Sequence, residues 1–145
     1  MTLKRRTSRL AKAGVVAAAT AGLIAGVHSA SADTTAPELS VAPSSGLTDG
    51  ATITATVTGL AANETYWIGP CGMTDNGCAG DPDSVVEATS DGSGDLTTEL
   101  TVNKEFVGNV GTGNDVSIDC AETQCKVGVY NADIVALDRT PIHFG

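Results

Sequence analysis

The amino-acid sequence predicts an all-β protein, a seven-stranded antiparallel β-sandwich of the immunoglobulin type. Residues 51–58 alternate strictly, with Ala, Ile, Ala and Val at the odd positions and Thr at every even position. A side-chain period of two places these two sets on opposite faces of one strand. Turn-forming residues recur at intervals of roughly 8–12 residues, the spacing of a β-sandwich. No helical period follows residue 32, so nothing in that part of the sequence favours an α-containing fold.

Runs rich in apolar and β-branched residues predict strands at 38–42, 51–58, 65–69, 84–89 and 95–102, and a last strand within 134–144. In the strand at 95–102, Leu96, Leu100 and Val102 are expected to face inward. Phe106 is expected to fill the core after that strand ends. Asn63 suits the turn that precedes the strand at 65–69, because its side chain tolerates turn conformations.

The remaining segments are assigned from their turn chemistry. Residues 72–83 and 109–114 are rich in Gly, Asp and Asn, which predicts loops. Residues 116–120 and 125–130 are expected to form the two arms of a hairpin. Pro141 suits an edge strand or a bulge, because proline cannot donate a hydrogen bond to a neighbouring strand.

The first 32 residues have the layout of a secretory signal peptide. An uncharged apolar run at 13–27 and a small-x-small cleavage site at 30–32 follow a basic head made of Lys4, Arg5, Arg6, Arg9 and Lys12. A membrane anchor is the alternative, but the run is short for a span of about 20 residues. The Arg5-Arg6 pair also admits the twin-arginine route. Cleavage after Ala32 would leave residues 33–145 as one secreted domain without a membrane segment.

The charge of residues 33–145 argues against a nucleic-acid-binding surface. This part of the chain keeps three basic residues, Lys104, Lys126 and Arg139, against 17 acidic ones, a net charge of −14. A protein that binds phosphates directly needs the opposite sign. The composition therefore favours export of a soluble acidic domain.

Four cysteines lie in the same part of the chain, at Cys71, Cys78, Cys120 and Cys125. In a small exported domain they are expected to form two disulfides, for which three pairings exist. The local pairing, Cys71 with Cys78 and Cys120 with Cys125, closes two short loops. A four-thiolate zinc site is the alternative, but the spacings are wider than in a zinc knuckle and export exposes thiols to oxidation. We expect no metal.

No catalytic constellation is evident. His143 is the single histidine after the leader, and no Gly-x-Ser-x-Gly elbow occurs. Asp91 to Asp95 begins like a calcium loop, but Leu96 and Val102 stand where that loop needs Gly and Glu, so a hairpin turn is expected there. The residues do not point to an enzyme.

Three aspartates, Asp75, Asp81 and Asp83, crowd one segment. They could hold a weak cation, but a solvated acidic loop is the interpretation we favour.

Several segments together resemble the neocarzinostatin family of enediyne-antibiotic apoproteins from actinomycetes. They span nearly the whole mature chain in one order and lie at residues 41–50, 65–71, 100–108, 118–128 and 142–145. The most specific are the Pro-Ser-Ser-Gly-Leu-x-Asp-Gly turn at 43–50 and the Asp-Cys-x4-Cys-x-Val-Gly segment at 119–128. The resemblance implies a seven-stranded sandwich with a ribbon arm and the two local disulfides.

The resemblance also implies a function. The protein would be a carrier, expected to be monomeric, that holds a small, largely apolar enediyne-type chromophore non-covalently and uses no catalytic cofactor. It would delay activation of this ligand and release it to cut DNA, so contact with DNA would come only through the ligand. The alternative is an exported immunoglobulin-like module that binds another small molecule or a protein partner, without a chromophore.

The positions that the resemblance assigns to the ligand are Trp67, Gly69, Met73, Val85, Gly111, Lys126 and Tyr130. Trp67 and Gly69 would form the floor of the cleft, and the last two residues would come from the segment at 120–130. Met73, Val85 and Gly111 stand where relatives carry bulky aromatic residues. Such a cleft offers fewer rings to the ligand, which Trp67, Tyr130 and the adaptable Met73 would offset.

Overall fold

The computed structural model describes residues 35–111 and 113–145. Within them lie ten strands: β1 (Glu38–Ala42), β2 (Ala51–Thr58), β3 (Thr65–Thr74), β4 (Gly77–Gly80), β5 (Val86–Thr89), β6 (Leu96–Val102), β7 (Glu105–Asn109), β8 (Asp115–Asp119), β9 (Cys125–Tyr130) and β10 (Ala136–Ile142). No helix forms in this part of the chain, and so none there could cross a membrane. The predicted signal peptide and its cleavage site lie outside the described residues.

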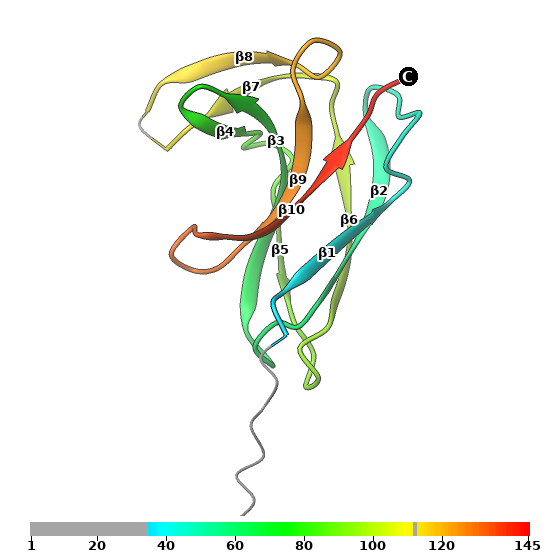
Figure 1. The fold of residues 1–145 in the computed structure, drawn as a ribbon, viewed down its shortest axis with the longest axis vertical. Helices are drawn as coiled ribbons and strands as arrows, with labels where there is room; N and C mark the ends of the chain where they lie inside the picture. The colour runs from blue at the N-terminus through cyan, green and yellow to red at the C-terminus, as the bar shows by residue number, and fades with distance from the viewer. Residues whose placement is uncertain (1–34, 112) are drawn as a thin grey trace, which may run out of the picture. The chain divides into compact units, whose positions relative to one another are not determined.

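The strands form two antiparallel sheets that face each other (Figure 1). One has the order β1-β2-β6, and the other has the order β10-β9-β3-β4-β7-β8, with β5 paired to β3. The expected sandwich corresponds to the first sheet facing β10, β9, β3 and β5. Strands β7 and β8 form the ribbon arm, which joins the second sheet through one pair, Gly80 with Asn109. The all-β sandwich with an arm is therefore confirmed.

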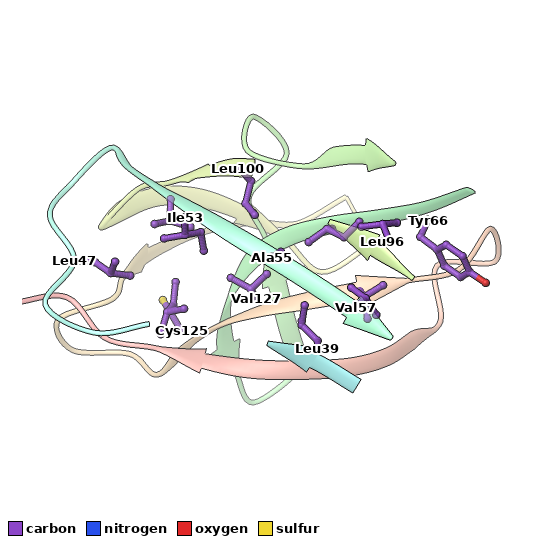
Figure 2. Packing of buried hydrophobic residues seen from close by; sticks show 14 of the residues in the cluster. Leu39, Leu47, Ile53, Ala55, Val57, Tyr66, Leu96, Leu100, Cys125 and Val127 are labelled. Atoms are coloured by element: carbon purple, nitrogen blue, oxygen red, sulfur yellow. The ribbon is translucent and has the colours of Figure 1, made fainter. Parts of the chain in front are cut away.

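The core lies between the two sheets, as the alternating pattern predicts. Ile53, Ala55 and Val57 of β2 are buried, while the intervening threonines are exposed or half-buried. They belong to one hydrophobic core with Ile68 of β3. Val127 of β9 and Leu39 of β1, which Figure 2 labels, are part of the same core.

The inward residues of the neighbouring strand were also predicted correctly. Leu96, Leu100 and Val102 are buried in β6. Phe106 packs against the core as expected, but it does so from within β7. Asn63 adopts a φ of 59°, the left-handed turn conformation that Asn tolerates.

The loop predicted at residues 72–83 is wrong in its first half. β3 continues through Thr74 and pairs with β4, which begins at Gly77. Gly, Asp and Asn have low strand propensity, but the Cys71–Cys78 disulfide ties the two arms of this hairpin together. Covalent closure and cross-strand pairing therefore override the local preference.

The hairpin predicted between residues 116–120 and 125–130 is also wrong. β8 pairs with β7, from Glu105↔Asp119 to Asn109↔Asp115, whereas β9 lies between β3 and β10. β9 is buried along most of its length and therefore needs partners on both edges, while the exposed pattern of β8 suits a ribbon. The intervening turn only redirects the chain.

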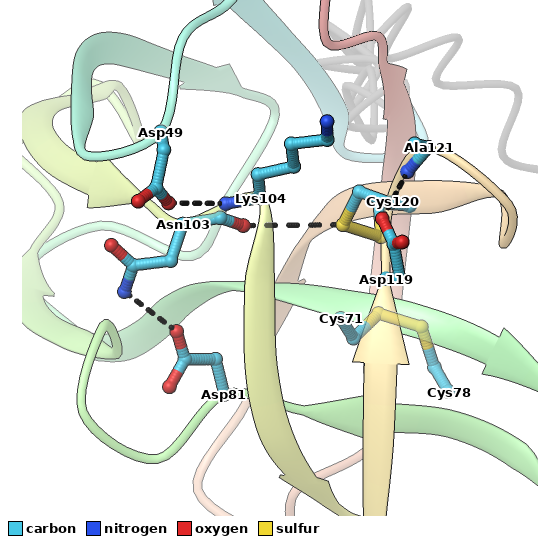
Figure 3. Close-up of a disulfide and its surroundings, with 10 residues drawn as sticks. Asp49, Cys71, Cys78, Asp81, Asn103, Lys104, Asp119, Cys120 and Ala121 are labelled. Atoms are coloured by element: carbon cyan, nitrogen blue, oxygen red, sulfur yellow. Dashed lines mark hydrogen bonds between the residues drawn. A yellow bond between two sulfur atoms is a disulfide. The ribbon is translucent and has the colours of Figure 1, made fainter.

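Both local disulfides form. Cys71 pairs with Cys78 and Cys120 with Cys125, each with a Cα–Cα distance of 5.4 Å. The second bridge lies where the ribbon joins the sandwich (Figure 3), and the Cys120 sulfur is 3.9 Å from the carbonyl oxygen of Asn103. On the loop-entropy model each bridge contributes about 2 kcal/mol to stability.

Hydrogen bonds between β1 and β10 link one sheet to the other. The Leu39 N–H donates to Asp138 Oδ2 at 2.7 Å, and the Thr140 hydroxyl donates to the Leu39 carbonyl. Further on, the main chain of His143 donates to Ser44 and accepts from Leu47. The imidazole of His143 itself is exposed, so this residue anchors the end of the chain through its backbone.

The acidic segments serve the local fold. Asp81 is buried, and its carboxylate accepts from the Ser84 hydroxyl at 2.7 Å, the Asp83 N–H at 3.1 Å and the Asn103 side-chain amide at 3.3 Å. Asp91 Oδ1 accepts the N–H groups of Ser93 and Asp95, which makes the expected turn. Among the described residues, no group of His, Cys, Asp and Glu is arranged to hold a metal ion.

The Asp91 turn predicts a pH dependence of stability. Hydrogen bonds from the backbone N–H of Asp95, then of Ser93, hold the pKa of Asp91 below its usual value. The stability that these hydrogen bonds add to the folded state is therefore present above the unfolded pKa of about 3.9. It is lost as the pH falls through the lower pKa of the folded state. Asp91→Asn should be less stable than the wild type at neutral pH, with a gap that narrows under acid.

Urea unfolding across the acid range measures this gap. Asp75→Asn, which removes one exposed carboxylate from a different turn, is the control for net charge. A gap between Asp91→Asn and the wild type that stays constant with pH would contradict the assignment.

Candidate functional site

A cavity of about 390 Å³ lies on the face of β3 and β9 that points away from the core. Its volume falls in the range of small-molecule sites, about 300–1,000 Å³. The lining side chains are mostly apolar or aromatic, and the lining residues are Trp67, Gly69, Pro70, Cys78, Gly80, Pro82, Val85, Asn109, Val110, Gly111, Tyr130, Ile134 and Arg139.

Two glycines that face each other underlie the floor, which Gly69, Val85 and Tyr130 line. Gly69 of β3 pairs with Gly128 of β9. A Cβ at Gly69 would lie 2.8 Å from Val85 Cγ2, and a Cβ at Gly128 would lie 2.6 Å from the Tyr130 hydroxyl oxygen. Because neither position carries a side chain, Val85 and the Tyr130 ring can lie down against the sheet. The shape of the cavity floor therefore depends on the absence of side chains at Gly69 and Gly128.

Tyr130 joins two sides of the cavity. Tyr130 pairs with Trp67 of β3 in the sheet, and the Tyr130 hydroxyl oxygen lies 3.6 Å from the Cys71 sulfur. On the other side, the Arg139 guanidinium carbon lies 5.6 Å from the ring centroid, and Arg139 Nε donates to the hydroxyl at 3.5 Å. The guanidinium thus lies in cation–π contact with the Tyr130 ring.

The turn between β9 and β10 supplies an apolar rim. Ile134 is 66% exposed and has a φ of 59°, a region that β-branched residues rarely adopt. Asn131 holds this turn, since its side-chain oxygen accepts the N–H groups of Asp133 and Val135. Strain of this kind persists only where the surroundings impose it.

A larger hollow of about 590 Å³ runs along the ribbon arm and differs in character. Three of its lining residues, Glu105, Asp119 and Glu122, are acidic. Apolar contact comes mainly from Phe106 and Ile118. An open acidic groove does not suit a largely apolar ligand, and none of the positions expected from the sequence lines it.

The structure brings together five of the seven positions that the sequence assigned to a ligand. These five line the cavity on the sheet face, and they are Trp67, Gly69, Val85, Gly111 and Tyr130. Met73 and Lys126 are half-buried outside its lining: Met73 pairs with Cys78 in the β3–β4 hairpin, and Lys126 lies on β9 opposite Cys71.

Sequence analysis missed Gly128, Ile134 and Arg139. The x-Val-Gly segment after Cys125 drew attention to Gly128 as part of a motif, but only cross-strand register shows that it faces Gly69. Arg139 is one of only three basic residues after residue 32, which was a usable signal. Its position on the cavity face depends on a bulge that the sequence does not reveal.

Comparison with known proteins shows to which family the chain belongs. The model of the neocarzinostatin family matches residues 39–144. The chain belongs to this family. It is 36% identical to the antitumor antibiotic C-1027 apoprotein and to actinoxanthin, both of Streptomyces globisporus, over 100% of each chain. It is 33% identical to macromomycin of Streptomyces macromomyceticus over 86% of this chain and 88% of that one.

Solved structures of the family share the fold. Macromomycin superposes with a TM-score of 0.69 at 27% identity, covering 76% of this chain and 100% of its own. The solution structure of apokedarcidin gives a TM-score of 0.61 at 28% identity, covering 77% of this chain and 100% of its own. The sandwich around the cavity is therefore a family scaffold.

Gly128 should act on the cavity through Tyr130. Gly128→Ala adds a methyl group where the far end of the Tyr130 ring lies, so the ring must move off the floor while the backbone can stay. We expect weaker binding of an aromatic probe such as N-phenyl-naphthylamine, measured by fluorescence titration. In a Tyr130→Ala background the same methyl group meets no ring, so the effect should largely vanish, with a coupling of about 1 kcal/mol. Equal effects in both backgrounds would show that Gly128 acts elsewhere.

The left-handed conformation of Ile134 should lower the stability of the protein, while its side chain should contribute to binding a ligand. Asn tolerates the left-handed conformation, so Ile134→Asn should raise the free energy of unfolding by about 1 kcal/mol. It should also weaken binding of the same apolar probe, because it removes part of the rim. Val135→Asn is the matched control, since Val135 is 55% exposed in the same turn but does not line the cavity. A loss of stability in Ile134→Asn would contradict the strain argument.

Proposed function

We propose that this protein is an exported carrier that binds an enediyne-type chromophore non-covalently in the cavity on β3 and β9, shields it, and later releases it. One observation carries the proposal: a member of the neocarzinostatin family has an open cavity walled by Trp67, Val85 and Tyr130. Its relatives include a protein named as an antitumor antibiotic apoprotein. The role is binding, and no residue is assigned a catalytic step.

Protection follows from the chemistry of the walls. A reactive ligand lasts longer where apolar surfaces exclude water. The four cysteines Cys71, Cys78, Cys120 and Cys125 are all in disulfides, so they present no free thiol to the ligand. Trp67 and Tyr130 offer ring faces to a flat ligand, which favours stacking.

In this proposal the polypeptide itself does not bind DNA. With a net charge of −14 on residues 33–145, the polypeptide repels the phosphate backbone. Damage to DNA would therefore require the ligand to leave the protein. The same charge keeps the carrier soluble and favours a monomer after export.

Met73 and Lys126 have a conditional place in this proposal. Both lie outside the cavity lining, so they touch the ligand only if it extends past the cavity wall. The other five assigned positions contact a ligand of cavity size.

The test is to purify the protein in the dark from the culture that produces it and to record a native mass spectrum. The proposal predicts a complex heavier than the polypeptide by one small molecule that absorbs in the ultraviolet. Gly80→Phe should lose this species while still folding, because a side chain at Gly80 enters open space at the cavity without strain. Gly92→Phe is the matched control, since Gly92 also has open space around it but lies in the turn before β6.

Two outcomes would count against the carrier function. A bare polypeptide mass under repeatedly gentle conditions would favour the alternative, a family-fold module without a chromophore. A bound molecule that survives Gly80→Phe unchanged would place the ligand outside this cavity.

A further inference from the structure

Arg139 is the one charged side chain among the described residues that line the cavity. The chain has only two other basic residues after residue 32, Lys104 and Lys126, and neither lines the cavity. Arg139 therefore supplies the only positive charge among the described residues that line the cavity. Such an arrangement attracts a negative group to that point.

A β-bulge decides which residue occupies this place. Ala136 pairs with Tyr130, but the register then shifts, so that Asp138 pairs with Val129 and Arg139 with Gly128. If the ladder continued regularly from Ala136, Leu137 would pair with Val129 and Asp138 would lie opposite Gly128. Because neighbouring residues of a strand point to opposite faces, the bulge puts the cation on the cavity face and the carboxylate on the other.

The carboxylate next door does not neutralise Arg139. Asp138 Oδ2 accepts the Leu39 N–H at 2.7 Å, and Oδ1 accepts the main-chain N–H of Arg139 at 2.8 Å. The guanidinium contacts Tyr130 instead, through a long hydrogen bond of 3.5 Å from Nε and through the ring face. Its terminal N–H groups therefore remain available, and they have the planar geometry that binds a carboxylate or sulfonate through two bonds.

We propose that the ligand of this cavity carries an anionic group that binds the Arg139 guanidinium, while its flat apolar body packs against Trp67, Val85 and Tyr130. This inference rests on the proposed carrier function and adds a ligand class to it: an aromatic or polyunsaturated body with an acidic substituent at one end. Arg139 acts as the specificity residue that orients this end toward the cavity mouth.

Two dyes with one skeleton test the charge preference. Anilinonaphthalene sulfonate is anionic, and N-phenyl-naphthylamine has the same rings without the sulfonate. Both are titrated by fluorescence into the folded protein. Arg139→Gln should weaken the anionic dye about tenfold, the lower end for a charge-assisted hydrogen bond because the side chain is exposed. It should leave the neutral dye unchanged within about twofold, since the neutral dye makes no bond to the guanidinium.

Three controls separate this effect from others. Lys104→Gln removes the same charge away from the cavity and should change neither dye. Arg139→Lys keeps the charge and should restore part of the affinity for the anionic dye. Gly80→Phe should exclude both dyes, which assigns them to this cavity. Near-ultraviolet circular dichroism confirms that each variant is folded.

The outcomes are distinct. Equal loss of both dyes in Arg139→Gln, or no loss of the anionic one, would overturn the assignment while the carrier function stands. Binding of the neutral dye alone by the wild type would do the same. If neither dye binds the wild type, this inference fails, whereas the carrier function is decided separately by the native mass spectrum.

Discussion

The pairing of Gly69 with Gly128 is the constraint on which the site depends. Two adjacent central strands meet at residues without side chains, so the sheet has a shallow floor where most sheets carry a ridge. Val85 and Tyr130 lean into the space that these positions leave. Everything that makes the cavity selective, including the Tyr130 ring and the cation above it, is arranged around this floor.

β3 serves both the core and the cavity because its two faces do different work. Tyr66 and Ile68 point into the sandwich and are buried, whereas Trp67 and Gly69 line the cavity. The packed core fixes the backbone, and the backbone in turn fixes the spacing of the lining residues. A site built on a central strand is held more rigidly than one built on loops, which is consistent with the proposed carrier role.

Sequence reasoning reached the sandwich, the two disulfides and five of the thirteen residues that line the cavity for identifiable reasons. The strict alternation of residues 51–58 defines a strand without any tertiary information, and the spacing of the cysteines together with the family resemblance pointed to local bridges. β4 was missed because pairing and a disulfide stabilise a segment whose own propensity is low, and β7 was missed because its two apolar residues, Phe106 and Val107, are too short a run to indicate a strand without its pairing to β8. Gly128 and Arg139 were missed because cross-strand register and a bulge are relations between distant residues, and one sequence does not contain them. The signal peptide and the domain boundary at residue 32 stay predictions.

The bulge at Leu137 has an evolutionary consequence. Removal of one residue from β10 after Arg139, with both ends of the ladder held in register, would absorb the bulge, so that Leu137 would pair with Val129 and Asp138 with Gly128. Arg139 would then turn to the other face of the strand. A relative could thus switch from accepting acids to accepting bases by a length change in an edge strand. Homologues that are one residue shorter in β10 are therefore the place to look for carriers whose cargo has the opposite charge.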